Sequence, residues 1–118
     1  MKGLLLKESL NNLSVLDTLR ITKTETWNVQ NATADQPSLW TALSFEQDDD
    51  LDNLVAEQLS QSIKPKGWYV NASTDTCVYV IFPKKVFKYP IGDREQGEKA
   101  KQFGRLLDIP ENQLDWSK

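Results

Sequence analysis

The 118-residue chain has no histidine and a single cysteine, Cys77, and these two shortages exclude several kinds of chemistry. Without histidine there is no imidazole to activate a serine or cysteine nucleophile, and no Cys/His cluster for zinc. One cysteine cannot close an intramolecular disulfide, which fits a reducing compartment. Because Cys77 lies in a run rich in branched residues, we interpret it as a buried small hydrophobe rather than an activated thiolate.

Glycine-rich loops and long apolar runs are also missing. Gly92 and Gly97 stand alone, and neither precedes the Lys-Ser/Thr pair of a phosphate-binding loop. Near the N-terminus only residues 4–6 form an apolar run before a charge, which is too short for a signal-peptide core or a membrane span. We therefore expect a cytoplasmic protein with no membrane association, and the sequence predicts no catalytic residue, no cofactor and no metal site.

The composition that remains is that of an ordinary globular protein, with 39% hydrophobic and 26% charged residues, and the length predicts a single domain over residues 1–118. The net charge of −3 is mild but unevenly spread. All charged residues between positions 35 and 63 are acidic, whereas residues 64–89 are rich in lysine. The densest acidic group lacks the spacing of a calcium loop, so it indicates a helix start: Asp48, Asp49, Asp50 and Asp52.

Apolar periodicity predicts strands over residues 19–29 and 39–46, paired antiparallel. Lys23 and Glu25 interrupt the apolar face of the first of these strands. This interruption predicts a β-bulge that re-phases the strand, the alternative being that the two charges line a partly buried groove. Residues 1–18 fit neither period and are predicted only as a short strand followed by a turn or short helix.

A first helix is predicted to end near Ile63, because Pro65 and Gly67 follow. Its apolar stripe comprises Leu51, Leu54, Val55, Leu59 and Ile63. Three further strands, 68–73, 77–82 and 86–89, should form a meander, and Asp93 should cap a second helix over residues 94–107. The fold class is therefore α+β: an antiparallel sheet of four to five strands with two amphipathic helices on one face, in the order ββαβββα, and with the opposite face open.

The lysine-rich segment carries aromatic residues between its lysines, a combination that single-stranded nucleic-acid binders use. The negative net charge and the protective role of lysines at sheet edges disfavour that interpretation. We predict instead a surface for a protein partner or for self-association. Its candidate residues are Lys84, Lys85, Lys88, Tyr89, Tyr69, Asn71 and Tyr79.

Three stretches carry a resemblance: Lys2-Gly3-Leu4 with Glu8-Ser9-Leu10; Trp68-Tyr69-Val70, Tyr79-Val80-Ile81-Phe82 and Lys85-Val86-Phe87-Lys88; and Phe103-Gly104, Ile109-Pro110-Glu111 and Gln113-Leu114-Asp115-Trp116. Together they resemble a family of small uncharacterised prokaryotic proteins of similar length and element order. That family has no assigned activity, cofactor or catalytic residue. The resemblance therefore implies a self-contained prokaryotic domain and nothing about its chemistry.

Two functions are predicted. The first is a non-enzymatic protein-binding or regulatory module, acting through the open sheet face or the lysine-rich hairpin. The second is a small-molecule-binding protein or atypical enzyme with a pocket between the sheet and the C-terminal tail. Residues expected to line that pocket are Tyr69, Asn71, Tyr79, Tyr89 and Asp115.

Overall fold

The computed structural model describes residues 1–29, 36–114 and 116. In this part of the chain the α+β class is confirmed, because six strands form one antiparallel sheet that is accompanied by two α-helices. The strands are β1 (Lys2–Leu6), β2 (Arg20–Asn28), β3 (Leu39–Glu46), β4 (Val70–Ser73), β5 (Cys77–Phe82) and β6 (Lys85–Pro90). The helices are α1 (Asp52–Ser60) and α2 (Arg94–Leu106), with 3-10 helices η1 (Lys7–Ser9), η2 (Leu13–Thr18), η3 (Asp49–Leu51) and η4 (Glu111–Gln113).

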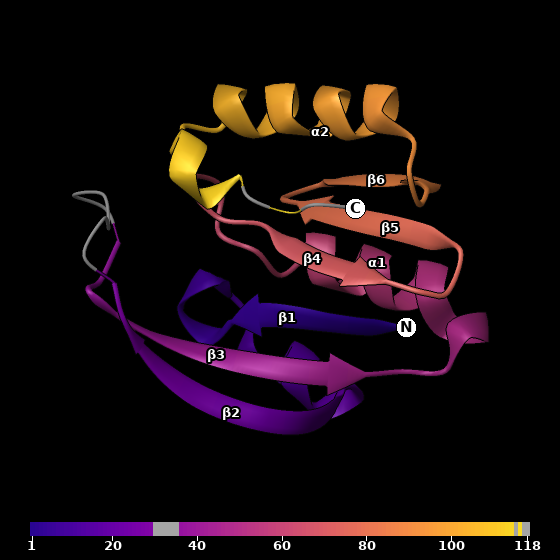
Figure 1. Ribbon diagram of the computed structural model, residues 1–118. Helices are drawn as coiled ribbons and strands as arrows, with labels where there is room; N and C mark the ends of the chain where they lie inside the picture. The colour runs from indigo at the N-terminus through magenta and orange to yellow at the C-terminus, as the bar shows by residue number, and fades with distance from the viewer. Residues whose placement is uncertain (30–35, 115, 117–118) are drawn as a thin grey trace.

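β1 lies inside the sheet, whose strand order is β2-β3-β1-β4-β5-β6 (Figure 1). It pairs antiparallel with β3 on one side and with β4 on the other. The short strand predicted within residues 1–18 is confirmed as β1, but the predicted count of four to five strands and the order ββαβββα did not include it and were therefore wrong. Its sequence shows no clear alternation because both of its faces are covered in part: Leu5 is fully buried, and Leu6 is half-buried on the other face.

Two local predictions for the sheet are confirmed. β4, β5 and β6 pair in sequence as a meander. In β2 the register shifts between Ile21, which opposes Phe45, and Lys23, which opposes Ser44. This irregularity is the predicted bulge, and it moves Lys23 and Glu25 to the face opposite Ile21.

The two helices cover opposite faces of the sheet, which corrects the prediction that both lie on one face. In β5, Tyr79 packs in a core with Leu59 of α1, whereas Val80 packs in a second core with Ala100 of α2. Side chains alternate between the faces of a strand, and both faces of β5 are apolar and buried, so each face needs its own cover. Figure 1 shows α1 behind the sheet and α2 beyond β6.

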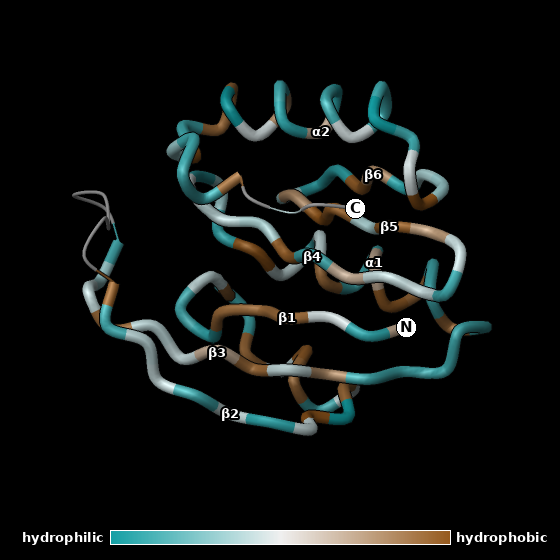
Figure 2. The backbone as a smooth tube through the Cα atoms, viewed as in Figure 1, coloured by the Kyte–Doolittle hydropathy of each residue, from teal (hydrophilic) through white to brown (hydrophobic). Residues whose placement is uncertain are grey.

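On the face that α2 covers, no described helix lies over β1, β3 and β2 (Figure 1). β2 is exposed at every one of its nine positions. In Figure 2 this edge strand is coloured mostly teal to white, so it is largely hydrophilic. This uncovered half of the sheet is where the candidate site lies. None of the described helices is long and apolar enough to cross a membrane.

α2 matches its prediction closely, since it begins after Asp93, whose side chain accepts a hydrogen bond from the Gln96 amide. α1 differs, because it ends at Ser60, and Ile63 beyond it forms an isolated bridge with Leu10. Its predicted stripe was also partly wrong. Leu51 and Leu54 are exposed, and the buried face is made by Val55, Ala56, Leu59 and Ser60.

Candidate functional site

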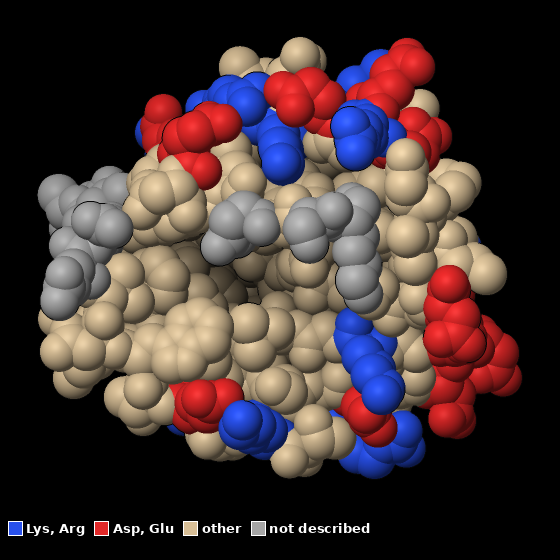
Figure 3. All heavy atoms as spheres, in the orientation of Figure 1, with Lys and Arg blue, Asp and Glu red and all other residues tan. Residues whose placement is uncertain are grey.

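A pocket of about 360 Å³ opens on the uncovered half of the sheet. Its aromatic lining residues are Trp27, Trp40, Trp68, Trp116 and Tyr69, its polar ones Asn71, Asn112 and Gln113, and its smaller ones Leu4, Leu6, Val29 and Gly67. We call this site the tryptophan pocket, because it gathers all four tryptophans of the chain. Figure 3 shows the hollow at the centre of the face that Figure 1 presents.

The tryptophans reach the pocket from different segments. Trp27 of β2 and Trp40 of β3 oppose each other in the strand register, so both side chains point to the same face of the sheet. Trp68 lies just before β4, and its ring centroid is 5.4 Å from that of Trp40. Trp116 comes from the C-terminal segment and meets Tyr69 edge-on at 5.2 Å. The pocket therefore exists only when distant parts of the chain have come together.

The C-terminal segment forms one wall and is fastened to the body by hydrogen bonds. The hydroxyl of Tyr69 donates to the backbone carbonyl of Gln113. The Gln113 side-chain amide donates to Gln36 Oε1 over 3.1 Å and accepts from Gln36 Nε2 over 3.2 Å. The indole nitrogen of Trp116 donates to the Tyr89 hydroxyl over 2.9 Å. These bonds hold the wall in place without a ligand.

An ion-pair cluster holds the start of the same segment against α2. The guanidinium of Arg105 makes two parallel hydrogen bonds to the Glu111 carboxylate, of 2.8 and 2.7 Å, and a third of 3.0 Å to Glu98. These contacts lower the pKa of Glu111. The cluster is exposed, so it contributes little to stability. Its role is to fix the direction in which η4 leads the chain toward the pocket.

The polar groups of the pocket have hydrogen-bonding capacity to spare among the described residues. Asn71 makes only one long contact, of 3.5 Å from its amide nitrogen to the Tyr79 carbonyl, so its side-chain oxygen is free to accept. Asn112 is exposed. The Trp68 ring is 5% exposed, and its indole N–H, which donates to no described residue, is not cut off from solvent. Both donors and acceptors are therefore available to a bound molecule.

Charge is absent from the described lining of the pocket. In Figure 3 the blue and red side chains of the described Lys, Arg, Asp and Glu residues lie toward the rim of this face. The described walls thus offer aromatic rings, amides and an indole N–H. Rings and amides of this kind can contact a ligand by stacking and hydrogen bonding.

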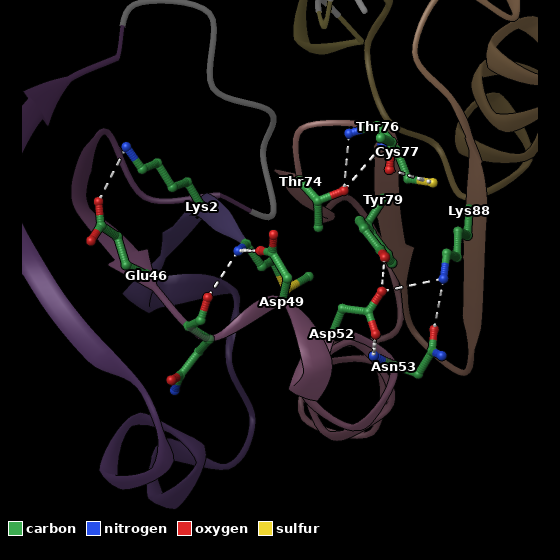
Figure 4. A network of polar contacts seen from close by, with 12 residues as sticks. Lys2, Glu46, Asp49, Asp52, Asn53, Thr74, Thr76, Cys77, Tyr79 and Lys88 are labelled. Carbon is green, nitrogen blue, oxygen red and sulfur yellow. Dashed lines mark hydrogen bonds and ion pairs between the residues drawn. The ribbon is translucent and has the colours of Figure 1, made fainter.

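A second polar cluster lies on the α1 face of the sheet (Figure 4). The Tyr79 hydroxyl donates to Oδ2 of Asp52, the first residue of α1, and the Lys88 ammonium lies 3.2 Å from the same oxygen. Lys88 also reaches Oδ1 of Asn53 over 3.4 Å. We call these four residues the Asp52 cluster.

The contacts of the Asp52 cluster shift the pKa values of its three ionisable residues. Burial of the phenol, followed by its bond to the carboxylate, raises the pKa of Tyr79 to about 12. The hydrogen bond from Tyr79 lowers the pKa of Asp52, and the hydrogen bonds with both partners raise that of Lys88. Tyr79 is 1% exposed, and its proton is committed to Asp52. We therefore interpret the cluster as a clamp that joins the start of α1 to β5 and β6.

The structure divides the predicted interaction residues among several places. Tyr69 and Asn71 line the tryptophan pocket, as the second predicted function requires. Tyr79 and Lys88 belong to the Asp52 cluster on the other face. Tyr89 is buried in the core beneath α2, where its hydroxyl supports Trp116 rather than lining the pocket.

Lys84 and Lys85 occupy the β5–β6 turn, where Lys84 has a positive φ of 62° and Lys85 lies over the Phe87 ring. Asp115, the remaining pocket residue predicted from the sequence, lies outside the described residues.

Sequence reasoning missed the tryptophans as site residues. One signal was readable, because Trp40 falls on the same face of its strand as Ala42 and Ser44, opposite the strongly apolar face with Leu43 and Phe45. A large ring on the more polar face of a strand needs a partner. That the partner would be Trp68 depends on β1 lying between β3 and β4, which no local pattern indicates.

Among the described residues, no three His, Cys, Asp or Glu side chains gather where they could hold a metal ion. Comparison of the chain with models of protein families, with curated proteins and with solved structures found no match. The family resemblance noted in the sequence therefore remains a prediction.

Proposed function

We propose that this protein is a non-enzymatic binding protein, and that it binds a small uncharged molecule in the tryptophan pocket. The observation that carries the proposal is the convergence of all four tryptophans on one pocket. Small-molecule sites are concave, aromatic-lined clefts of about 300–1,000 Å³ with a few placed polar groups. The pocket agrees with each part of that description, and its C-terminal wall is already fastened. We propose a cytoplasmic, prokaryotic setting as well, on the sequence evidence alone.

The test is a two-dimensional ¹H–¹⁵N spectrum of the labelled protein, recorded with a library of uncharged small fragments. Each tryptophan contributes one indole N–H signal, and all four indoles line the pocket. We expect fragments that bind to shift these signals. The proposal is overturned if no fragment binds, or if those that bind shift only backbone signals far from the pocket.

Matched variants make the result specific. Trp27 is 37% exposed on an edge strand, so Trp27→Ala should fold while losing one wall of the pocket. We expect it to weaken fragment binding at least tenfold. Leu106 is 82% exposed on α2 and does not line the pocket, so Leu106→Ser serves as the control and should bind as the wild type does.

Protein binding remains a second candidate function, favoured by the exposure of β2 along its whole length at one edge of the sheet. Such an edge can accept a further strand from a partner or from a second copy. For self-association the test is sedimentation velocity over a range of concentrations, combined with hydrogen exchange. A dimer with protected β2 amides would support it, and a monomer throughout would exclude it.

A further inference from the structure

We propose further that the molecule bound in the tryptophan pocket is an uncharged saccharide of one or two sugar rings. This inference rests on the proposed function. A sugar ring is puckered, with apolar C–H groups on its faces and hydroxyls around its edge. It needs aromatic surface for its faces and groups that both donate and accept hydrogen bonds for its edge.

The aromatic walls are inclined to one another rather than parallel. The planes of Trp40 and Trp68 meet at 59°, and those of Tyr69 and Trp116 at 65°. The rings of each pair are in contact with each other, so a ligand meets the pair from one side and not between its two rings. Inclined rings form a bowl, whose shape suits a puckered ring.

The polar groups match the edge of a sugar. Asn71 and Asn112 carry side-chain amides, each of which can donate to one hydroxyl and accept from another. Gln113 is already engaged with Gln36, so it shapes the wall and leaves recognition to its neighbours.

The described lining carries no cation for a phosphate or a carboxylate, and no anion for an ammonium group. Phosphorylated or acidic sugars would need such partners, because buried charges that remain unpaired are costly. Exposure of Trp27 at the mouth offers a platform on which a second ring can stack. The volume of about 360 Å³ lies near the lower end of small-molecule sites, which limits the occupant to one or two rings.

The experiment titrates the wild-type protein with glucose, galactose, N-acetylglucosamine, maltose and cellobiose, following the indole signals and tryptophan emission. Glucose 6-phosphate and glucuronate serve as charged probes, and adenosine as a planar one. We expect saturable shifts with at least one neutral saccharide. The charged sugars and adenosine should bind at least tenfold more weakly than that saccharide.

Variants locate the binding. Trp27→Ala and Asn71→Ala should each weaken binding of the responding saccharide at least tenfold, whereas Leu106→Ser should leave it unchanged. Far-ultraviolet circular dichroism confirms that each variant is folded.

Three outcomes are decisive. If adenosine or other planar fragments shift the indole signals while no saccharide does at millimolar concentration, the saccharide inference is overturned and the proposed function stands. If saccharides bind but Trp27→Ala and Asn71→Ala bind as the wild type does, the inference is also overturned. If neither saccharides nor fragments reach the pocket, both proposals fall together.

Discussion

Gly3 lies at the point of closest packing between β1 and its neighbours. A Cβ atom there would lie 2.5 Å from Cζ of Phe45 and 2.8 Å from Cβ of Ala72. We therefore expect Gly3→Ala to lower the free energy of unfolding by about 1–3 kcal/mol through overpacking. Urea denaturation measures the change.

Gly97, in the first turn of α2, provides the matched control, because the nearest neighbour of an added Cβ would be the Tyr89 hydroxyl at 3.4 Å. Gly97→Ala should be neutral or raise stability by up to about 1 kcal/mol, since alanine is the better helix former. Equal destabilisation by both substitutions would show that the close packing around Gly3 is not the cause.

Tyr79 is the residue whose hydroxyl joins the Asp52 cluster. Tyr79→Phe keeps the buried ring and removes the donor to the carboxylate. We expect a loss of about 1–3 kcal/mol in the free energy of unfolding, because the Asp52 carboxylate loses a hydrogen bond from a buried phenol. In a double-mutant cycle with Asp52→Ala, most of this loss should vanish.

At the scale of the elements, two leucines of α1 differ in burial although the sequence pattern predicts both to lie on the apolar face. Leu59 is fully buried, whereas Leu54 is 57% exposed. Leu59→Ala should therefore cost about 2–5 kcal/mol, and Leu54→Ala less than about 0.5 kcal/mol. Thermal or urea unfolding of the two variants measures the difference. Equal costs would mean that α1 is rotated relative to the orientation described above.

The same helix shows where sequence prediction of the elements reaches its limit. The position of α2 was predictable from local start and stop signals, because Asp93 caps the start of the helix and Pro110 follows its end. The rotation of α1 about its axis could not be predicted from its own residues. A nine-residue helix with apolar side chains on two sides can face the sheet with either side. Contact with β5 decides between them. The opposite placement of the two helices also depends on strand order, which no single segment encodes.

The candidate site was predicted in part. Tyr69, Asn71 and a pocket against the C-terminal segment follow from a strand pattern and from an apolar tail that must dock. Trp27 and Trp40 join them only because β3 pairs with β1, and β1 with β4, which brings chain positions far apart in sequence onto one face. Pairing over such distances is a tertiary property, so local periodicity does not reveal it.

At the scale of the whole molecule, stability should fall at alkaline pH. The pKa of Tyr79 is raised from 10.0 to about 12, and those of Lys88 and Tyr89 are raised as well. Between pH 10 and about 12 the unfolded chain has released the Tyr79 proton while the folded protein still holds it. Rising pH therefore favours unfolding in this window. Urea denaturation between pH 9 and 12 should show the decline.

The variant Tyr79→Phe separates the contribution of Tyr79 to the pH dependence of stability from that of Tyr89, because it lacks the Tyr79 phenol proton but keeps Tyr89. Its free energy of unfolding should fall less steeply over the same pH range. A slope identical to that of the wild type would show that Tyr79 does not titrate differently in the two states.

The two cores on either side of the sheet differ in how their residues are distributed along the chain. The buried residues of the core beneath α2 all come from residues 78–116, with Tyr69 packed against them, whereas the core beneath α1 spans residues 1–81 and includes Leu5 of β1. Contacts between near neighbours form quickly, and closing a long loop is slow. The C-terminal third can therefore begin to assemble early during folding. We therefore expect β1, which must insert between β3 and β4, to join the sheet late in folding.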